Sequence, residues 1–178
     1  MQHKVTVITP TGDRPLAFAL LEKWMNAQTR QPDQWIVIDD GKHPTPLSQP
    51  ADMQYIRREP RADDPKHTLV KNLQIALPLV QGDRVIIMED DEYYAPQYIE
   101  MMVMALKSHF LAGIKNAKYY HLPTGGFYQN HNDRHASLAQ TAFRASILPS
   151  VLKIVNEIKT QFVDIEIWKQ FLPQGKLF

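Results

Sequence analysis

Short apolar runs alternate with longer amphipathic stretches through residues 1–113. Runs rich in β-branched residues predict strands, and stretches with apolar residues three or four positions apart predict helices. The predicted strands are 4–9, 35–39, 53–58 and 83–89, and the predicted helices are 15–28, 68–81 and 95–113. Strands that alternate with helices predict a mixed, mostly parallel central sheet with right-handed crossovers, flanked by helices.

The rest of the chain follows a less regular pattern. Residues 118–137 combine histidine, asparagine, glycine and aromatic side chains, which is too polar for a core element and typical of a functional loop. After it, the pattern predicts a strand at 138–146, a helix at 147–161 and a last helix at 164–172. We therefore expect a single α/β domain across residues 1–178.

Composition adds little to this picture. Hydrophobic residues make up 44% of the chain and charged residues 22%, as in ordinary globular domains. Twenty basic and 19 acidic residues give a formal net charge of +1, so nothing global indicates nucleic-acid or membrane binding. The absence of cysteine excludes disulfides and thiolate metal sites. The N-terminus resembles a strand and no apolar run suits a membrane span, so we expect a cytoplasmic protein without a membrane anchor.

The stretch VIIMEDDEYYAP, residues 85–96, ends an apolar run on four consecutive acids: Glu89, Asp90, Asp91 and Glu92. One acid would be enough to cap the helix predicted to follow. Four adjacent carboxylates repel one another at the end of a buried strand, and a divalent cation would remove that cost. Because oxygen ligands of this kind suit Mg²⁺ or Mn²⁺, the pattern favours a metal site over a helix cap alone.

A second strand ends in the same way, at Asp39 and Asp40 in WIVIDDG. Asp-Gly is a strong turn signal, so a turn alone would also explain this pair. In an open parallel sheet, ligands bind outside the carboxyl ends of the strands. The loops after Thr9, Asp39 and Glu89 are therefore expected together on one edge. Neither a G-x-G-x-x-G nor a P-loop motif is present, so dinucleotide-binding and P-loop folds are not indicated.

Six segments, in order along nearly the whole chain, together resemble the GT-A glycosyltransferases, specifically the inverting enzymes of family two. Four of them resemble the nucleotide loop, the V-D-D-G strand, the A-R-N-x-G-I helix and the D-x-D strand: VTVITPTGDRP, WIVIDDG, VKNLQIAL and VIIMEDDEYYAP. The other two, TAFRASIL and FVDIEIWKQFLPQGKL, resemble the acceptor-side strand and the late E-D-x-x-L-W segment. The chain departs from the family pattern at Glu89, the first acid of the D-x-D motif, and at Val163, where the family usually has glutamate.

The resemblance implies a GT-A, Rossmann-like domain whose residues 1–113 bind the nucleotide sugar and whose residues 114–178 form the acceptor side. It implies a metal-dependent, inverting transfer from a nucleotide-diphosphate sugar, most simply a UDP-sugar, to a hydroxyl of a saccharide or of a hydroxymethylated DNA base. Asp91, assisted by Glu89, would hold Mn²⁺ or Mg²⁺. Asp164 would be the general base, kept ionised by the dipole of its helix.

By the same resemblance and the strand-end argument, two further groups of residues are expected to contact substrates. Those expected at the nucleotide sugar are Thr9, Pro10, Thr11, Arg14, Asp39, Asp40, Lys71 and Asp90. Those expected near the acceptor are His121, Tyr128, His131 and Arg144.

Two other functions stay open at this stage. A sugar nucleotidyltransferase uses a similar sheet, but a glycine-rich G-x-G-T-R loop would be expected after its first strand, and TPTGDRP matches that loop poorly. A catalytically silent relative that binds carbohydrate or nucleotide would keep the fold without turnover.

Overall fold

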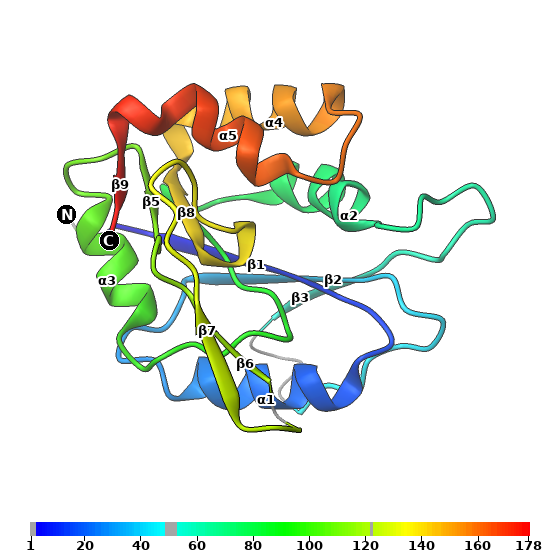
Figure 1. The fold of residues 1–178 in the computed structure, drawn as a ribbon. Coiled ribbons are helices and arrows are strands. Elements are labelled where there is room, and N and C mark those ends of the chain that lie inside the picture. The colour runs from blue at the N-terminus through cyan, green and yellow to red at the C-terminus, as the bar shows by residue number, and fades with distance from the viewer. Residues whose placement is uncertain (1–2, 49–52, 122) are drawn as a thin grey trace.

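The computed structural model describes residues 3–48, 53–121 and 123–178. Within these residues, a seven-stranded sheet has the order β3-β2-β1-β4-β8-β5-β9, and β6 and β7 form a separate two-stranded ribbon (Figure 1). The strands are β1 Val5–Thr11, β2 Gln34–Asp39, β3 Gln54–Arg57, β4 Arg84–Ile87, β5 Leu111–Gly113, β6 Lys118–His121, β7 Gly126–Gln129, β8 Thr141–Arg144 and β9 Gly175–Leu177.

Helices cover both faces of the main sheet. α1 and α3 lie on one face, and α2, α4 and α5 lie on the other (Figure 1). Their bounds are α1 Pro15–Asn26, α2 Leu69–Ala76, α3 Tyr98–Ala105, α4 Leu148–Glu157 and α5 Val163–Phe171. Short 3-10 turns follow as η2 Leu77–Leu79, η3 Leu138–Gln140, η4 Ala145–Ile147 and η5 Leu172–Gln174. No helix in these described ranges has both the length and the apolar character required to cross a membrane.

The hydrophobic core is divided into two layers by the sheet. In β2, Ile36 and Ile38 pack with α2, α4 and α5, while Trp35 and Val37 pack with α1 and α3. Successive side chains of a strand point to opposite faces, so a strand buried on both faces needs an unbroken apolar run. This requirement explains why WIVID and VII mark their strands so clearly in the sequence.

Strand direction sets which loops meet at one edge. β1 pairs in parallel with β2 and β4, and β2 pairs in parallel with β3. β8 runs antiparallel to β4 and β5, and β9 is parallel to β5. The predicted mixed, mostly parallel α/β sheet is confirmed, and the loops after β1, β2 and β4 share one edge.

Four strands were missed by the sequence pattern. The helix predicted over 95–113 is wrong at its end, because α3 stops at Ala105 and Leu111–Gly113 forms β5. Lys176 pairs with Ala112 in the short strand β9, which the pattern left out. The loop expected at 118–137 contains the ribbon of β6 and β7. Such short strands are held by pairing with distant segments, and they are too short to carry a periodic signal of their own.

Candidate functional site

The ends of β1 and β4 are joined by polar contacts. The Thr11 hydroxyl donates to Asp90 Oδ2 at 2.6 Å. Arg14 Nη2 lies 2.7 Å from Asp90 Oδ1, and Arg14 Nη1 lies 2.5 Å from Asp91 Oδ2. The expected grouping of these loops on one edge is therefore present, with Arg14 spanning two of the four acids.

The positive charge of Arg14 does not balance the negative charge of these four acids. Burial, followed by the charges of Asp91 and Glu92, raises the pKa of Glu89 to about 7. Burial also raises the pKa of Asp90, although Arg14 acts in the opposite direction. Asp90 is 2% exposed, whereas the Asp91 side chain is 50% exposed. The cluster therefore combines a buried acid with an accessible one, and further positive charge would stabilise it.

The donor set of this cluster suits a hard divalent cation. No group of three or more histidine, aspartate or glutamate side chains surrounds a metal position in the described part of the chain. Asp91 and Glu89 would supply carboxylate oxygens. Mg²⁺ in such sites typically takes one or two carboxylates and completes its shell with water and substrate phosphates. The residues thus fit an ion that is shared with a bound diphosphate.

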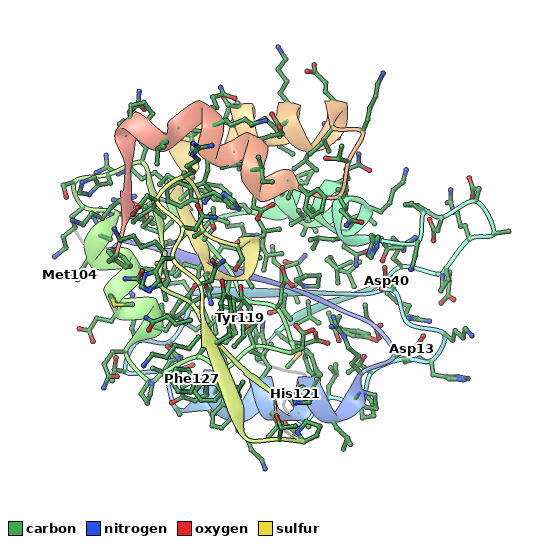
Figure 2. The ribbon with its side chains drawn as sticks, in the orientation of Figure 1. Asp13, Asp40, Met104, Tyr119, His121 and Phe127 are labelled. Carbon is green, nitrogen blue, oxygen red and sulfur yellow. The ribbon has the colours of Figure 1, made fainter. Side chains whose placement is uncertain are left out.

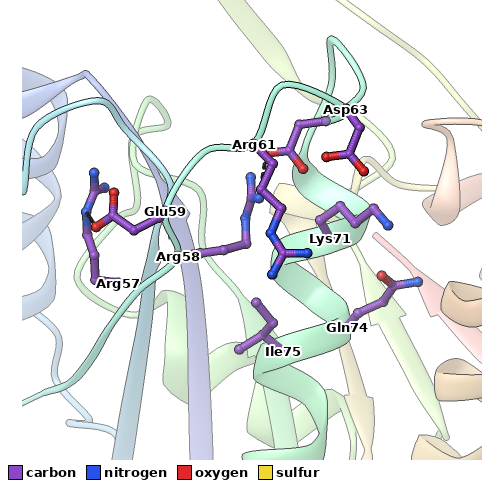
Figure 3. A pocket seen from close by; sticks show the side chains of 9 residues that line it. Arg57, Arg58, Glu59, Arg61, Asp63, Lys71, Gln74 and Ile75 are labelled. Atoms are coloured by element: carbon purple, nitrogen blue, oxygen red, sulfur yellow. Dashed lines mark hydrogen bonds and ion pairs between the residues drawn. The ribbon is translucent and has the colours of Figure 1, made fainter.

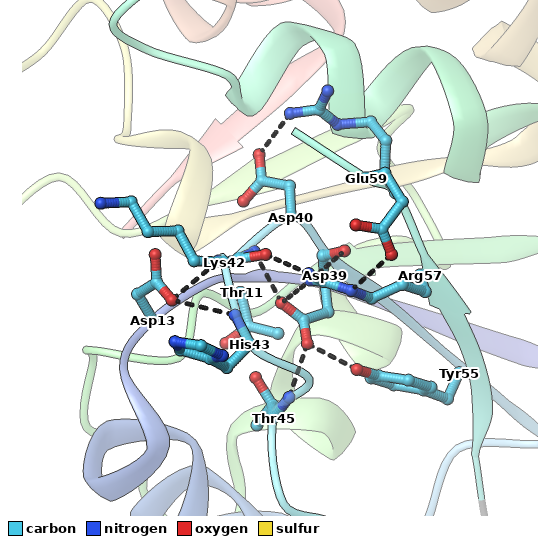
Figure 4. Close-up of polar contacts among 12 residues, drawn as sticks. Thr11, Asp13, Asp39, Asp40, Lys42, His43, Thr45, Tyr55, Arg57 and Glu59 are labelled. Atoms are coloured by element: carbon cyan, nitrogen blue, oxygen red, sulfur yellow. Dashed lines mark hydrogen bonds and ion pairs between the residues drawn. The ribbon is translucent and has the colours of Figure 1, made fainter. Parts of the chain in front are cut away.

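Asp39 is fully buried and internally satisfied. Its carboxylate accepts hydrogen bonds from Gly41 N at 2.9 Å, Thr45 N at 2.7 Å and the Tyr55 hydroxyl at 2.5 Å (Figure 4). Arg57 Nη1 lies 3.2 Å from Asp39 Oδ1. Burial alone would raise the pKa of Asp39, but these hydrogen bonds outweigh burial and lower it. In this structure Asp39 fixes the loop after β2 instead of facing the cleft.

Asp40, by contrast, lies at the cleft. Its Oδ2 accepts hydrogen bonds from Arg58 Nη2 at 2.8 Å and Asn72 Nδ2 at 3.1 Å. Arg58 also donates to Asp64 at 2.7 Å, so the loops after β2 and β3 are tied to α2. The cleft has a volume of about 320 Å³ and is lined by Pro10, Thr11, Gly12, Arg14, Asp40, Lys66, His67, Thr68, Leu69, Asn72 and Glu89.

Two further residues expected at the nucleotide do not line the cleft. Thr9 is fully buried, and its hydroxyl oxygen accepts a hydrogen bond from Trp35 Nε1 at 3.0 Å, so its side chain belongs to the core. Lys71 lies on α2 and lines a neighbouring cavity of about 470 Å³ (Figure 3). Arginines and acids both line this cavity, so Lys71 lies on a surface of mixed charge beside the cleft.

Asp164 is the second residue of α5 and is half-buried. Burial raises its pKa, although the N–H of Ile165 and the charge of His135 oppose this. The prediction that the helix dipole keeps this pKa low is wrong, because desolvation outweighs it. The pKa of Tyr119 on β6 is raised by burial and then by the charges of Glu92, Asp164 and Glu89. The charges of Asp164 and of the acid cluster therefore both raise the pKa of the Tyr119 hydroxyl.

Three of the four residues expected near the acceptor lie on or beside the ribbon. His121 is exposed on β6 (Figure 2). Tyr128 is exposed on β7, and His121 Nδ1 lies 2.7 Å from the hydroxyl oxygen of Thr124. His131 Nδ1 lies 2.7 Å from the side-chain oxygen of Asn116.

The fourth residue, Arg144, lies at the opposite end of the sheet's strands from the acid cluster. It pairs in register with Arg84, the first residue of β4, whereas the acids follow the last residue of that strand. Its guanidinium donates to the carbonyl of Leu106 at 2.7 Å and lies 5.0 Å from the centre of the Phe110 ring. The structure thus separates Arg144 from the cleft.

The sequence model of glycosyl transferase family 2 matches residues 6–163, which is most of the chain. The chain belongs to glycosyl transferase family 2. Asp164 lies one residue beyond the matched range. No curated protein matches the sequence.

Solved structures share the fold of this family 2 domain at low sequence identity. Staphylococcus aureus TarS 1-349 aligns with a TM-score of 0.68 at 15% identity, over 98% of this chain and 58% of TarS 1-349. The mannosyltransferase PcManGT from Pyrobaculum calidifontis, in complex with GDP-Man and Mn²⁺, aligns with a TM-score of 0.58 at 14% identity, over 85% and 47%. This family 2 domain thus spans only about half the length of these two relatives.

One fold neighbour is similar to the family 2 domain in size as well. CMP:2-keto-3-deoxy-manno-octonic acid synthetase, complexed with CTP, aligns with a TM-score of 0.60 at 13% identity, over 98% of this chain and 89% of that chain. At identities this low, the structural alignments show a common fold alone, and the reaction must be argued from the residues.

Sequence reasoning missed the residues that shape the two loops of the family 2 domain. Asp13 has a φ of 53° and accepts a hydrogen bond from Lys42 N at 2.8 Å, joining the loops after β1 and β2 (Figure 4). A Cβ on Gly41 would lie 2.4 Å from Asp13 N, so the close approach requires glycine. The Asp-Gly pair in WIVIDDG was the available sequence signal for this close approach of the two loops. No local sequence signal indicated that Tyr55 and Arg58 contact them.

Proposed function

We propose that this family 2 domain binds a nucleotide-diphosphate sugar at the edge formed by β1, β2 and β4. It would transfer the sugar to an acceptor hydroxyl with inversion of the anomeric carbon. The observation that carries the proposal is the acid cluster: Glu89 with its raised pKa, buried Asp90 and accessible Asp91 lie beside a cleft that also contains Arg14. Fold neighbours that were solved with UDP-GlcNAc and with GDP-Man and Mn²⁺ support a nucleotide-sugar donor.

The leaving group of this reaction is a diphosphate, so cationic groups must stand where its charge develops. Asp91 and Glu89 would hold Mg²⁺ or Mn²⁺, which neutralises charge on the leaving diphosphate when bound. Arg14 is the nearest protein cation, and it can donate to a phosphate oxygen from its place between Asp90 and Asp91. Asp40 would contact the nucleoside from the cleft wall.

Asp164 is proposed as the general base. It would accept the proton of the acceptor hydroxyl while that oxygen bonds to the anomeric carbon and the bond to the diphosphate oxygen breaks. One in-line displacement of this kind inverts the anomeric carbon and needs no second carboxylate as nucleophile. Burial raises the pKa of Asp164, which makes its carboxylate a stronger base toward the acceptor hydroxyl.

A sugar nucleotidyltransferase is the second candidate, and the size match with the CTP-bound synthetase favours it. Such an enzyme would transfer the nucleoside monophosphate of a nucleoside triphosphate to a sugar oxygen and release pyrophosphate. Against it, the family match is to the glycosyl transferases, and the first loop has one glycine, Gly12, in TPTGDRP.

Calorimetry with UDP and GDP, each with and without Mn²⁺, tests the donor site. Wild-type protein should bind at least one nucleotide more tightly with Mn²⁺, and Asp91→Asn should abolish that gain. Asp133→Asn is the matched control, because Asp133 pairs with Lys115 at 2.7 Å and is 82% exposed. Equal Mn²⁺-dependent binding by wild type and Asp91→Asn would refute the assignment.

A further inference from the structure

A cavity of about 260 Å³ lies beside the acid cluster and is separate from the nucleotide cleft. We call it the tyrosine pocket, and its lining includes Glu92, Tyr93, Tyr94, Tyr98, Met101 and Gln140. Most of these residues come from the β4–α3 connection and α3, and Gln140 comes from η3. Its volume is slightly below the usual range for small-molecule sites, about 300–1,000 Å³, so a single ring would fill it.

Aromatic rings that are already held in place form one wall of this pocket. The hydroxyls of Tyr94 and Tyr98 both donate to the carbonyl of Ala139, at 2.9 and 3.3 Å. The Tyr94 hydroxyl oxygen also accepts a hydrogen bond from the Glu89 N–H at 2.8 Å. The wall of the tyrosine pocket is thus connected directly to the first residue of the acid cluster.

The polar groups in the lining include two that can accept hydrogen bonds from a ligand, Gln140 and Glu92. The Oε1 atom of Gln140 is buried and has no hydrogen-bond partner among the residues that the structure describes. Leaving a buried acceptor unpaired costs about 1–3 kcal/mol, so a ligand with a suitable donor would relieve that cost. Glu92 adds a carboxylate. Among the residues that the structure describes, no lysine, arginine or histidine lines the pocket, so it contains no cation to hold an anionic group.

We propose that the tyrosine pocket binds one neutral sugar ring of the acceptor. A sugar ring offers hydroxyl donors for Gln140 and Glu92, and its C–H faces can pack on aromatic rings. Nucleic acid would bring phosphates to a pocket whose charged lining residue is a carboxylate, so a modified base in DNA is disfavoured. The assignment to the acceptor rests on the proposed function, whereas the pocket's affinity for a sugar ring does not.

Two methionines on α3 allow this binding to be observed directly. Met101 lines the pocket, whereas Met104, one turn further along, is 54% exposed and outside it. Protein labelled with ¹³C in its methionine methyl groups would be titrated, without nucleotide, with methyl glycosides of glucose, galactose, mannose and N-acetylglucosamine. At least one glycoside should shift the Met101 signal saturably and leave Met104 unchanged. If none shifts Met101, or if p-cresol shifts it and no glycoside does, the proposal is overturned.

Gln140→Leu separates binding from folding. Removing an unpaired buried acceptor should leave the melting temperature unchanged or raise it, while the loss of one hydrogen bond weakens glycoside binding about tenfold. Gln170→Leu, at an exposed position on α5, is the matched control and should bind like wild type. Equal affinity in wild type and Gln140→Leu would contradict the proposal. Because no nucleotide is present, this result is independent of whether the domain binds UDP or GDP.

Discussion

Asp39→Asn should destabilise the fold, because this carboxylate is the centre of a buried network. It is fully buried and receives hydrogen bonds from Gly41 N, Thr45 N and the Tyr55 hydroxyl, with Arg57 3.2 Å away. Asparagine has nearly the same shape, but it is neutral and has one acceptor oxygen instead of two. Its NH₂ group must therefore face backbone or side-chain donors that the carboxylate had satisfied.

The magnitude follows from what is left without a partner. Breaking a buried ion pair by removing one member costs about 3–5 kcal/mol, and an unmet buried donor costs about 1–3 kcal/mol. Arg57 keeps a second partner, since its Nε lies 3.3 Å from Glu59 and its side chain is 18% exposed. We therefore expect Asp39→Asn to lower the free energy of unfolding by about 3 kcal/mol, at the lower end of the ion-pair range.

Urea unfolding followed by circular dichroism measures this loss. A urea m-value of about 1–3 kcal/mol/M turns 3 kcal/mol into a midpoint shift of about 1–3 M. Asp133→Asn, which removes an exposed pair, should cost less than about 1 kcal/mol. If Asp39→Asn unfolds at the wild-type midpoint but loses nucleotide affinity, Asp39 contacts the ligand directly and our structural role for it is refuted.

Three further results are expected. Because hydrogen bonds lower the folded-state pKa of Asp39, its stabilisation is present above the unfolded pKa of about 3.9 and is lost as pH falls through the folded value. The melting temperature of the wild-type protein should therefore decrease as the pH is lowered below about 4. An equal decrease in Asp39→Asn would count against Asp39 as the cause. Asp164→Asn should reduce sugar transfer about 100-fold or more with nucleotide affinity nearly unchanged, whereas Glu166→Gln should do much less; loss of donor affinity alone would contradict this. Gly41→Ala should weaken nucleotide binding, because its Cβ would force Asp13 away, and an unchanged calorimetric affinity would show that the loops adjust freely.

The sheet could be predicted because its parallel strands are buried on both faces. That burial requires apolar runs such as WIVID and VII, and the acids that end them mark the edge where ligands bind. The ribbon of β6 and β7 could not be predicted, because its exposed aromatic residues resemble those of a polar loop. β5 and β9 could not be predicted because each is three residues long and is defined by its partners.

The candidate site was predictable in residue type more than in orientation. Whether a carboxylate at a strand end faces the cleft depends on its neighbours, and Tyr55 and Arg57 reach Asp39 only through the register of β3 on β2. Arg144 lies away from the cleft for a related reason. Because β8 is antiparallel to β4, the first residue of β8, Thr141, lies at the end of the strands near the acid cluster. Arg144, the last residue of β8, lies at the opposite end. Strand direction of this kind is a property of the whole sheet.

Release of nucleoside diphosphate tests the central claim most directly. Wild-type protein would be incubated with Mn²⁺ and UDP- or GDP-sugars, and anion-exchange chromatography would separate and quantify the nucleotide products. Sugar transfer, or slow hydrolysis when the acceptor is missing, predicts the appearance of UDP or GDP, and its loss in Asp91→Asn. Intact donors in every mixture, or conversion to nucleoside triphosphate only when pyrophosphate is added, would contradict a glycosyl transfer reaction.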